Sequence, residues 1–259
     1  MKIWAISDLH LGLSTGKWMG IFGPHWEGHH LKVEAAWREA VGQQDIVLVA
    51  GDLSWAMRPG DVQADLAWLA DLPGTKVLVK GNHDYWWPGT QARLAALLPR
   101  GVYAIKKRAI VIQGIPIIGV RGADFLVREG ETHQEVEARL IRERGELLQS
   151  IDDLRRFPQV DRRPICLFHY PPFPIGRSES FFTRILEDTG CSHCVYGHLH
   201  TAPEHQRVFQ GEQRGVRYSL VSCDYLDFRP LLLSEAAEPV PAADLSGEST
   251  PRSGSPQSS

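Results

Sequence analysis

The sequence lacks any apolar run long enough to cross a membrane, and we expect no signal peptide in its first residues. Its 259 residues begin Met1-Lys2-Ile3-Trp4-Ala5-Ile6-Ser7-Asp8, an apolar stretch too short for a signal peptide. No later run approaches the roughly 20 apolar residues that a spanning helix needs. The net charge is only −3, so no strong basic field would draw the chain to a polyanion or to a membrane surface. We therefore expect a cytoplasmic protein with no membrane partner.

Cysteine is scarce: the four are Cys166, Cys191, Cys194 and Cys223. In a cytoplasmic chain of this size they are expected to be free thiols, not a disulfide framework. Cys191 and Cys194 have CxxC spacing, but no second pair completes a zinc site of the usual kind. A structural zinc or a redox pair is the lesser alternative to small buried side chains.

The composition, 43% hydrophobic and 23% charged, is that of an ordinary globular protein. The length suits one domain of the larger sort, with a substantial core. From about Ala236 the chain becomes rich in Pro, Ser, Gly and Ala, with almost no large apolar residue to bury. We predict one domain over residues 1–235 and a disordered tail over 236–259.

Patterns typical of strands alternate with patterns typical of helices, which places the chain in the α/β class. Apolar runs predict strands at 3–7, 45–50, 76–80, 109–113, 115–120, 163–168, 194–196, 208–210 and 216–222. Helical spacing of apolar residues predicts helices at 31–41, 61–72, 90–98, 135–157 and 181–189.

Five short polar blocks follow the predicted strands. In chain order they are Asp8-Leu9-His10, Gly51-Asp52, Gly81-Asn82-His83-Asp84, His169 and Gly197-His198-Leu199-His200. Taken singly, each has an ordinary explanation as surface polarity or as a loop of turn-forming residues. Polar groups that follow the strands of an α/β sheet gather at one edge, so together the blocks predict a single site. Asp8 and His10 would face the same way, because an extended segment repeats every two residues.

The blocks match a known pattern, D-x-H, G-D, G-N-H-[DE], H and G-H-x-H, and the chain thereby resembles the calcineurin-like metallophosphoesterase superfamily. The resemblance runs from Asp8 to His200 and is specific for the superfamily, though weakly specific for substrate. It implies a four-layer α-β-β-α sandwich with a dimetal site on the loops at the carboxyl ends of the strands.

The resemblance also implies a set of roles. One ion would be held by Asp8, His10, Asp52 and His200, and the other by Asp52, Asn82, His169 and His198, with Asp52 as the bridge. His83 would lie beside the ions as a catalytic residue, and Asp84 would orient it.

The chemistry of these residue types agrees with such roles. Two divalent ions with Asp8, Asp52 and a shared hydroxide leave a net charge near +1, which suits a phosphate anion. Water shared by two cations is acidified, so a metal-bridged hydroxide could attack phosphorus while the ions neutralise developing charge. His83 could protonate the leaving oxygen, with Asp84 fixing its tautomer. Imidazole, carboxylate and amide ligands suit two divalent ions, Mn²⁺ being the expected one and Fe, Zn, Co or Ni the alternatives.

Candidate substrate contacts are weaker. All eight tryptophans lie in the first 87 residues, and Trp55 and Trp86 lie in loops where a base or an aromatic group could stack. Packing of the loops is the alternative that we favour slightly. Arg121 follows a predicted strand and could bind a phosphate oxygen, the alternative being a surface ion pair. The 12–30 segment is long for a connection and is typical of a lid or a binding loop.

We expect a dimetal phosphohydrolase with a slight preference for phosphodiesters, because His10 and His83 are both present, as in members of the resembled family that cleave diesters, and no arginine cluster is evident. A phosphomonoesterase, including a protein or small-molecule phosphatase, is the alternative. A noncatalytic metal-binding scaffold is an alternative of another class, which the complete set of polar groups disfavours. The partner is a phosphate ester whose identity the sequence leaves open, and nucleic acid would be a partner only as a substrate.

Overall fold

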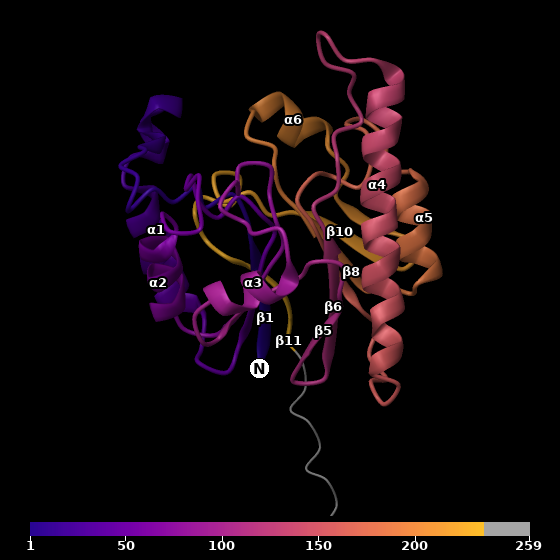
Figure 1. The fold of residues 1–259 in the computed structure, drawn as a ribbon, viewed down its shortest axis with the longest axis horizontal. Coiled ribbons are helices and arrows are strands. Elements are labelled where there is room, and N and C mark those ends of the chain that lie inside the picture. Colours follow the sequence, from indigo (N-terminus) through magenta and orange to yellow (C-terminus); the bar gives the residue numbers. More distant parts are fainter. Residues whose placement is uncertain (236–259) are drawn as a thin grey trace, which may run out of the picture.

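The computed structural model describes residues 1–235, and the predicted tail at 236–259 lies outside the described residues. Two sheets stand face to face with helices on their outer sides (Figure 1). The first sheet has the order β11-β1-β2-β3-β4 and the second the order β5-β6-β7-β8-β10-β9. The predicted four-layer α-β-β-α architecture is therefore confirmed.

The strands of the first sheet are β1 (Lys2–Ile6), β2 (Ile46–Val49), β3 (Thr75–Leu78), β4 (Val102–Ala104) and β11 (Leu231–Glu235). Those of the second sheet are β5 (Ile110–Ile112), β6 (Ile115–Val120), β7 (Ile165–Phe168), β8 (His193–Tyr196), β9 (Gly211–Gln213) and β10 (Val216–Leu220). Strands β1 to β4 are parallel to one another, and so are β6, β7, β8 and β10. The remaining strands, β11, β5 and β9, pair antiparallel at the edges.

The helices α1 (His29–Ala40), α2 (Gln63–Asp71) and α3 (Gln91–Leu97) lie on the side of the first sheet. The helices α4 (His133–Asp152) and α5 (Phe181–Asp188) cover the second, and α6 (Ala202–Arg207) lies near the loop edge. Three 3₁₀ turns complete the list: η1 (Met19–Phe22), η2 (Pro24–Trp26) and η3 (Asp153–Arg156).

Alternation along the strands creates three cores. Trp4 and Ile6 of β1 face the helices, whereas Ile3 and Ala5 face the other sheet. In β7, Phe168 packs in the core on the helix side of the second sheet, whereas Ile165 and Leu167 pack in the core between the two sheets. Because both faces of each sheet are covered, the central strands are apolar throughout, as parallel sheets require.

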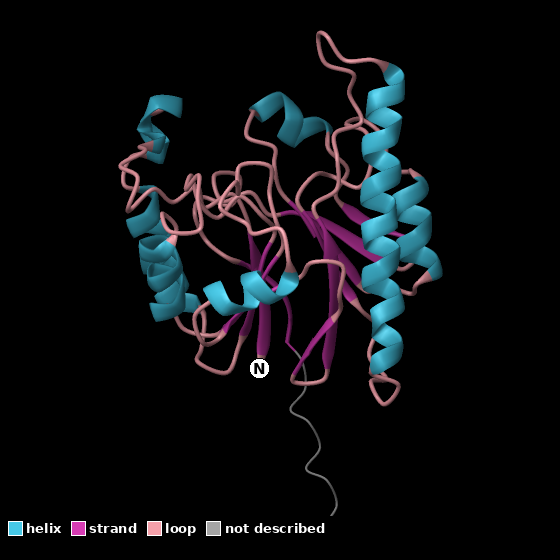
Figure 2. Cartoon of the chain, viewed as in Figure 1, coloured by secondary structure: helices cyan, strands magenta, loops and turns pink. Residues whose placement is uncertain are grey.

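The loops gather at one edge of both sheets (Figure 2). This is the carboxyl edge of the parallel strands, where an α/β fold places its ligand sites. No helix within residues 1–235 is long and apolar enough to span a bilayer. The cytoplasmic location stays a prediction. All four cysteines are buried free thiols, as expected.

Candidate metal centre

The polar blocks meet at this carboxyl edge. Asp8 and His10 follow β1, Asp52 follows β2, Asn82 and His83 follow β3, His169 follows β7, and His198 and His200 follow β8. Six of these side chains form two groups whose ligand atoms lie within 4.8 Å of one another. The groups are Asp8, His10 and His200, and Asp52, His169 and His198. Each group takes residues from both sheets.

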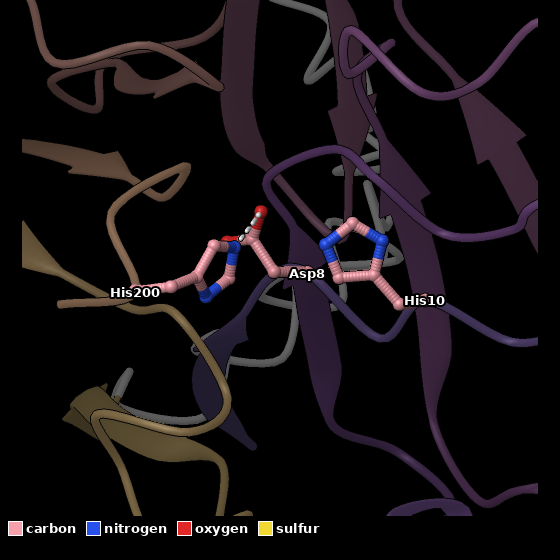
Figure 3. A group of neighbouring side chains, drawn as sticks. All are labelled: Asp8, His10 and His200. Carbon is pink, nitrogen blue, oxygen red and sulfur yellow. Dashed lines mark ion pairs between the residues drawn. The ribbon is translucent and has the colours of Figure 1, made fainter. Parts of the chain in front are cut away.

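The first group surrounds the carboxylate of Asp8. Figure 3 shows Asp8 between the rings of His10 and His200, with an ion pair to the latter. His200 Nε2 lies 3.6 Å from Asp8 Oδ1. The second oxygen, Asp8 Oδ2, accepts from the backbone N–H of His198 at 3.0 Å and from the hydroxyl of Ser7. One oxygen is thus held in place and the other is turned toward the histidines.

The second group is arranged around His169. Its Nε2 lies 2.6 Å from Asn82 Oδ1 and 3.4 Å from Asp52 Oδ2. The same oxygen of Asp52 lies 3.8 Å from His10 Nε2, an atom of the first group. Asp52 Oδ2 therefore faces both groups, while Asp52 Oδ1 accepts from the backbone N–H of His83 at 2.8 Å.

The residues fit two metal ions. Donor atoms about 2.1 Å from one ion lie roughly 3–3.5 Å apart, close to the spacings found here. Asp8 Oδ1 and His10 Nδ1 are buried and lack a hydrogen-bond partner, which is costly unless something else binds them. A Cβ at Gly81 would overlap Asp52, and a Cβ at Gly197 would overlap Asp8, so glycine lets the loops approach the carboxylates. The ligand roles themselves stay predictions.

The backbone at the site is strained in a consistent way. Four of the residues have positive φ: Asp8 (58°), His10 (43°), Asp52 (50°) and His198 (74°). Such conformations are uncommon outside glycine, although Asp, Asn and His adopt them more readily than other residues. They cluster where function demands a geometry that the chain would not otherwise choose.

The electrostatics separate the histidines into two kinds. Burial lowers the pKa of His169 to about 4 and that of His198 to about 3, so both are neutral imidazoles, the form that binds a metal. Burial also acts to lower the pKa of His200, but its bonds to Asp224 and Asp8 outweigh this and raise it to about 10. Burial and the neighbouring carboxylates of Asp84 and Asp8 raise the pKa of Asp52 well above its ordinary value.

Asp224 is a residue that sequence reasoning missed. Its Oδ1 lies 3.0 Å from His200 Nδ1, leaving Nε2 of that ring to face Asp8. A carboxylate behind a ligand histidine fixes its orientation and its tautomer. Asp224 follows β10, a strand of the same parallel set, so its place after a strand was the signal available. His169 is held likewise, with Nδ1 3.1 Å from the carbonyl oxygen of Ala50.

Asp84 does not orient His83, and that expectation is wrong. Its Oδ1 accepts from the backbone N–H groups of Leu53 (3.0 Å) and Ser54 (3.2 Å). Oδ1 also accepts from the Trp86 indole N–H at 2.9 Å, and Oδ2 accepts from Gly81 N–H at 2.8 Å. The buried carboxylate ties the loop after β2 to the loop after β3, and within the described residues no hydrogen bond joins it to the ring of His83.

The ring of His83 is held by aromatic packing. It lies 4.5 Å from the ring of Trp55 and 5.6 Å from that of His10. Trp55 in turn stacks on His10 at 4.7 Å and 21°. His83 is half-buried and burial lowers its pKa, so its neutral ring retains one N–H to donate.

The other expected substrate contacts divide. Trp55 is half-buried beside the site and remains a candidate. Trp86 is fully buried (0% exposed) and bound to Asp84, so the expectation that it contacts substrate is corrected. Arg121 pairs with Glu143 at 2.6 Å, while its carbonyl accepts from His169 N–H at 3.0 Å.

Comparisons with known proteins agree with this geometry. The model of the calcineurin-like phosphoesterase family matches residues 1–202. The gene 66 protein of Mycobacterium phage L5 is 37% identical over 81 residues, which are 31% of this chain and 39% of that protein. The chain thus spans about two fifths of the length of that relative. The gene 66 protein of Mycobacterium phage D29 is 27% identical, over 52% of this chain and 80% of that protein.

Among solved structures, a phosphopantetheinyl hydrolase from Mycobacterium tuberculosis has the same fold. Its TM-score is 0.52 at 18% identity, and the match covers 93% of this chain and 98% of that one.

Proposed function

This chain belongs to the calcineurin-like phosphoesterase family, and from that membership we propose that it is a dimetal phosphohydrolase that prefers phosphodiesters. The observation that carries the proposal is the position of Asp52, whose Oδ2 faces His10 on one side and His169 on the other. One carboxylate oxygen between two groups of ligand atoms is what a shared ligand of two ions requires.

Two ions, proposed to be Mn²⁺, would be held by the two groups, with Asn82 joining the second group and Asp52 shared. When bound, such ions act as Lewis acids on phosphate oxygens and acidify water. The protein's part is to fix the ligand geometry and to bring the scissile group to it. The hydrogen bonds that hold Asp52 Oδ1 and Asp8 Oδ2 supply that rigidity.

His83 is proposed to donate its N–H to the leaving oxygen or to a nonbridging phosphate oxygen. It lies next to the ligands in the chain, its ring faces His10, and no side-chain hydrogen bond within the described residues engages it. Trp55 packs on both rings, so it holds the donor beside the centre and excludes water from one side.

The preference for diesters follows from the charge available. A dianionic monoester favours a free arginine that can bind two oxygens at once. Arg121 reaches the site through its carbonyl, but Nη2 of its guanidinium is committed to Glu143. A diester, with one negative charge, does not need that second cation.

The test is hydrolysis of bis-p-nitrophenyl phosphate and p-nitrophenyl phosphate by metal-stripped protein refilled with Mn²⁺. We expect faster cleavage of the diester, and a loss of roughly a thousandfold or more in Asp52→Ala, since that change removes the shared ligand. Asp61→Ala, which removes an exposed carboxylate, is the matched control.

Faster cleavage of the monoester would contradict the preference for diesters. No turnover of either ester, with two ions bound per chain, would contradict the phosphohydrolase and favour a binding scaffold. Activity retained in Asp52→Ala would contradict the role of that residue.

A further inference from the structure

A cavity opens at the carboxyl edge of the sheets, and none of the candidate metal ligands lines it. It measures about 290 Å³, far above the ~15 Å³ that one water needs. Its walls come from the ends of β3 and β6, from the loop after β4, and from the middle of α4.

The lining of this cavity is strongly cationic. Five positive side chains, Lys80, Lys106, Lys107, Arg121 and Arg142, face it together with two carboxylates, Glu143 and Glu146. Glu146 pairs with Lys107 at 3.3 Å. Glu143 accepts from Arg121 at 2.6 Å and lies 3.7 Å from Arg142. The carboxylates therefore leave a clear surplus of positive charge, in a protein whose net charge is negative.

Several polar atoms that line the cavity have hydrogen-bonding capacity that no neighbouring residue in the described part of the chain takes up. Lys106 Nζ donates to the carbonyls of Pro88 (2.9 Å) and Gly89 (2.6 Å), which fix the ammonium and leave its third N–H. Lys80 is half-buried and, within residues 1–235, pairs with no carboxylate or carbonyl. Arg121 Nε and Glu143 Oε2 are buried without a partner, the oxygen in a side chain that is only 3% exposed. Buried polar atoms of this kind call for a ligand or for water.

The cavity adjoins the metal centre through two short links. Lys80 precedes Asn82 by two residues, which span at most about 7 Å. Arg121 accepts at its carbonyl from the backbone N–H groups of His169 (3.0 Å) and Tyr170 (2.9 Å). The cavity and the candidate metal centre therefore lie on neighbouring loops at the same edge of the sheets.

We propose that this basic cavity binds a second anionic group of the substrate, a phosphate, while the scissile phosphate lies at the metal centre. The proposal rests on the phosphohydrolase function proposed above. Lys80 and Lys106 offer point charges and the unpartnered Nε–H of Arg121 offers a directed donor, a combination that suits a tetrahedral dianion. The natural substrate would then be a phosphate ester carrying at least two phosphate groups.

The first test needs neither metal nor turnover. Calorimetric titration of metal-stripped protein with inorganic phosphate should show saturable binding of one anion per chain. We expect Lys80→Gln and Arg142→Gln to weaken that binding about tenfold or more, since each removes a cation from the cavity. Arg155→Gln removes an exposed cation from η3 and should bind phosphate as the parent does.

The second test asks whether the bound anion belongs to the substrate. Thymidine 5′-(p-nitrophenyl phosphate) and its 3′-phosphorylated counterpart share one scissile bond and differ by one phosphate. With Mn²⁺ bound, kcat/KM should favour the 3′-phosphorylated ester by tenfold or more. The ratio should fall toward one in Lys80→Gln and in Arg142→Gln, and it should hold in Arg155→Gln.

The outcomes separate the two proposals. Absence of phosphate binding below about 10 mM, or binding unchanged in both cavity variants, would overturn the cavity proposal whatever the enzyme hydrolyses. Cavity-dependent phosphate binding together with equal kcat/KM for the two esters would show a site for free phosphate, and would overturn the link to substrate. If the protein binds phosphate in the cavity but cleaves no phosphate ester, both the proposed phosphohydrolase activity and the proposed role of the cavity in substrate binding would be contradicted.

Discussion

At the scale of single residues, the chain of contacts from Asp224 through His200 to Asp8 governs how the first group behaves. Without metal, His200 carries a proton that balances the carboxylates on either side, as its raised pKa indicates. An ion held by His200, as proposed, would take the place of that proton. The residue behind the ligand therefore affects both the geometry and the charge of the site.

Asp224→Asn is expected to weaken metal binding by about 10–100-fold, the usual effect of losing a carboxylate behind a ligand histidine. The measurement is titration of metal-stripped protein with Mn²⁺. Asp227→Asn is the matched control, an exposed carboxylate three residues along the chain. Equal affinities in the two variants would show that Asp224 has only a structural role.

Metal binding at pH 7 is expected to release at least one proton per chain, because His200 has a pKa of about 10 and an imidazole must be neutral to bind a metal. The sign follows directly: the affinity rises with pH and falls about tenfold per pH unit of acidification for each proton displaced. Titrations at one pH in buffers of different ionisation enthalpy count the protons. Heats that do not depend on the buffer would contradict this.

The sequence could predict which residues gather at the edge, because ligand types recur in order after parallel strands. The sequence could not predict which hydrogen-bond donor each carboxylate oxygen of the site would bind. Asp84 follows His83 directly, so proximity suggested a pair, but three backbone N–H groups from the loops after β2 and β3 and the Trp86 indole take its oxygens. That choice is made by tertiary packing, which the spacing of residues does not encode.

At the scale of elements, Lys76 shows how a strand and a helix can share one side chain. It lies in β3, only 2% exposed, and its ammonium donates to the carbonyls of Leu72 and of Ala70 (3.4 Å) at the end of α2. A cation there satisfies carbonyls that the helix leaves free and complements its dipole. Burial lowers the pKa of Lys76 to about 8.

This predicts a pH dependence of stability. Between about pH 8 and the ordinary value of 10.5, the unfolded chain holds more protons at Lys76 than the native one. The free energy of unfolding of the parent, relative to Lys76→Met, should therefore rise with pH in that window and be level below it. Urea unfolding at pH 7, 8, 9 and 10 measures it. Lys32→Met, which removes an exposed lysine, is the control, and an identical slope for both variants would contradict the prediction.

The central elements could be predicted and the edges could not. Continuous apolar runs marked β1, β2, β3 and β7 because their strands are covered on both faces. β4 has an exposed tyrosine among three residues, and β11 lies at the edge of the first sheet, so neither carried that signal. A strand was expected at 208–210, but β9 forms at Gly211–Gln213, where it pairs antiparallel with β10.

At the scale of the whole molecule, both metal groups join the two sheets. The first takes Asp8 and His10 from the loop after β1, and His200 from the second sheet. The second combines Asp52 of the first sheet with His169 and His198 of the other. Elsewhere the sheets are held together by the apolar core between them. Ions bound at the edge would link the two sheets through their polar ligands, in addition to that apolar core.

Saturating Mn²⁺ is therefore expected to raise Tm. An ion at a hundred times its Kd stabilises by about 2.7 kcal/mol, and 1 kcal/mol shifts Tm by about 2–4 °C at this size. We expect a rise of about 5–10 °C for one tightly bound ion, reversed by EDTA and largely lost in Asp52→Ala. Thermal unfolding followed by circular dichroism measures it. A Tm that is unchanged at saturating Mn²⁺ would mean that the native chain binds the ion no more tightly than the unfolded chain does, and would contradict a preformed metal centre.

The positive φ angles at Asp8, His10, Asp52 and His198 have a consequence for how the site can evolve. Glycine, asparagine, aspartate and histidine tolerate that backbone, whereas glutamate, cysteine and branched residues do so poorly. A single mutation that keeps the fold can therefore replace one of these residues only by another of the few types that tolerate a positive φ, and the side chains among them offer oxygen or nitrogen donors. Under the ligand roles proposed above, descendants of this chain could exchange oxygen and nitrogen donors at these positions, but they could not readily acquire a thiolate centre here. The backbone conformation therefore limits which side chains these four positions can acquire during evolution.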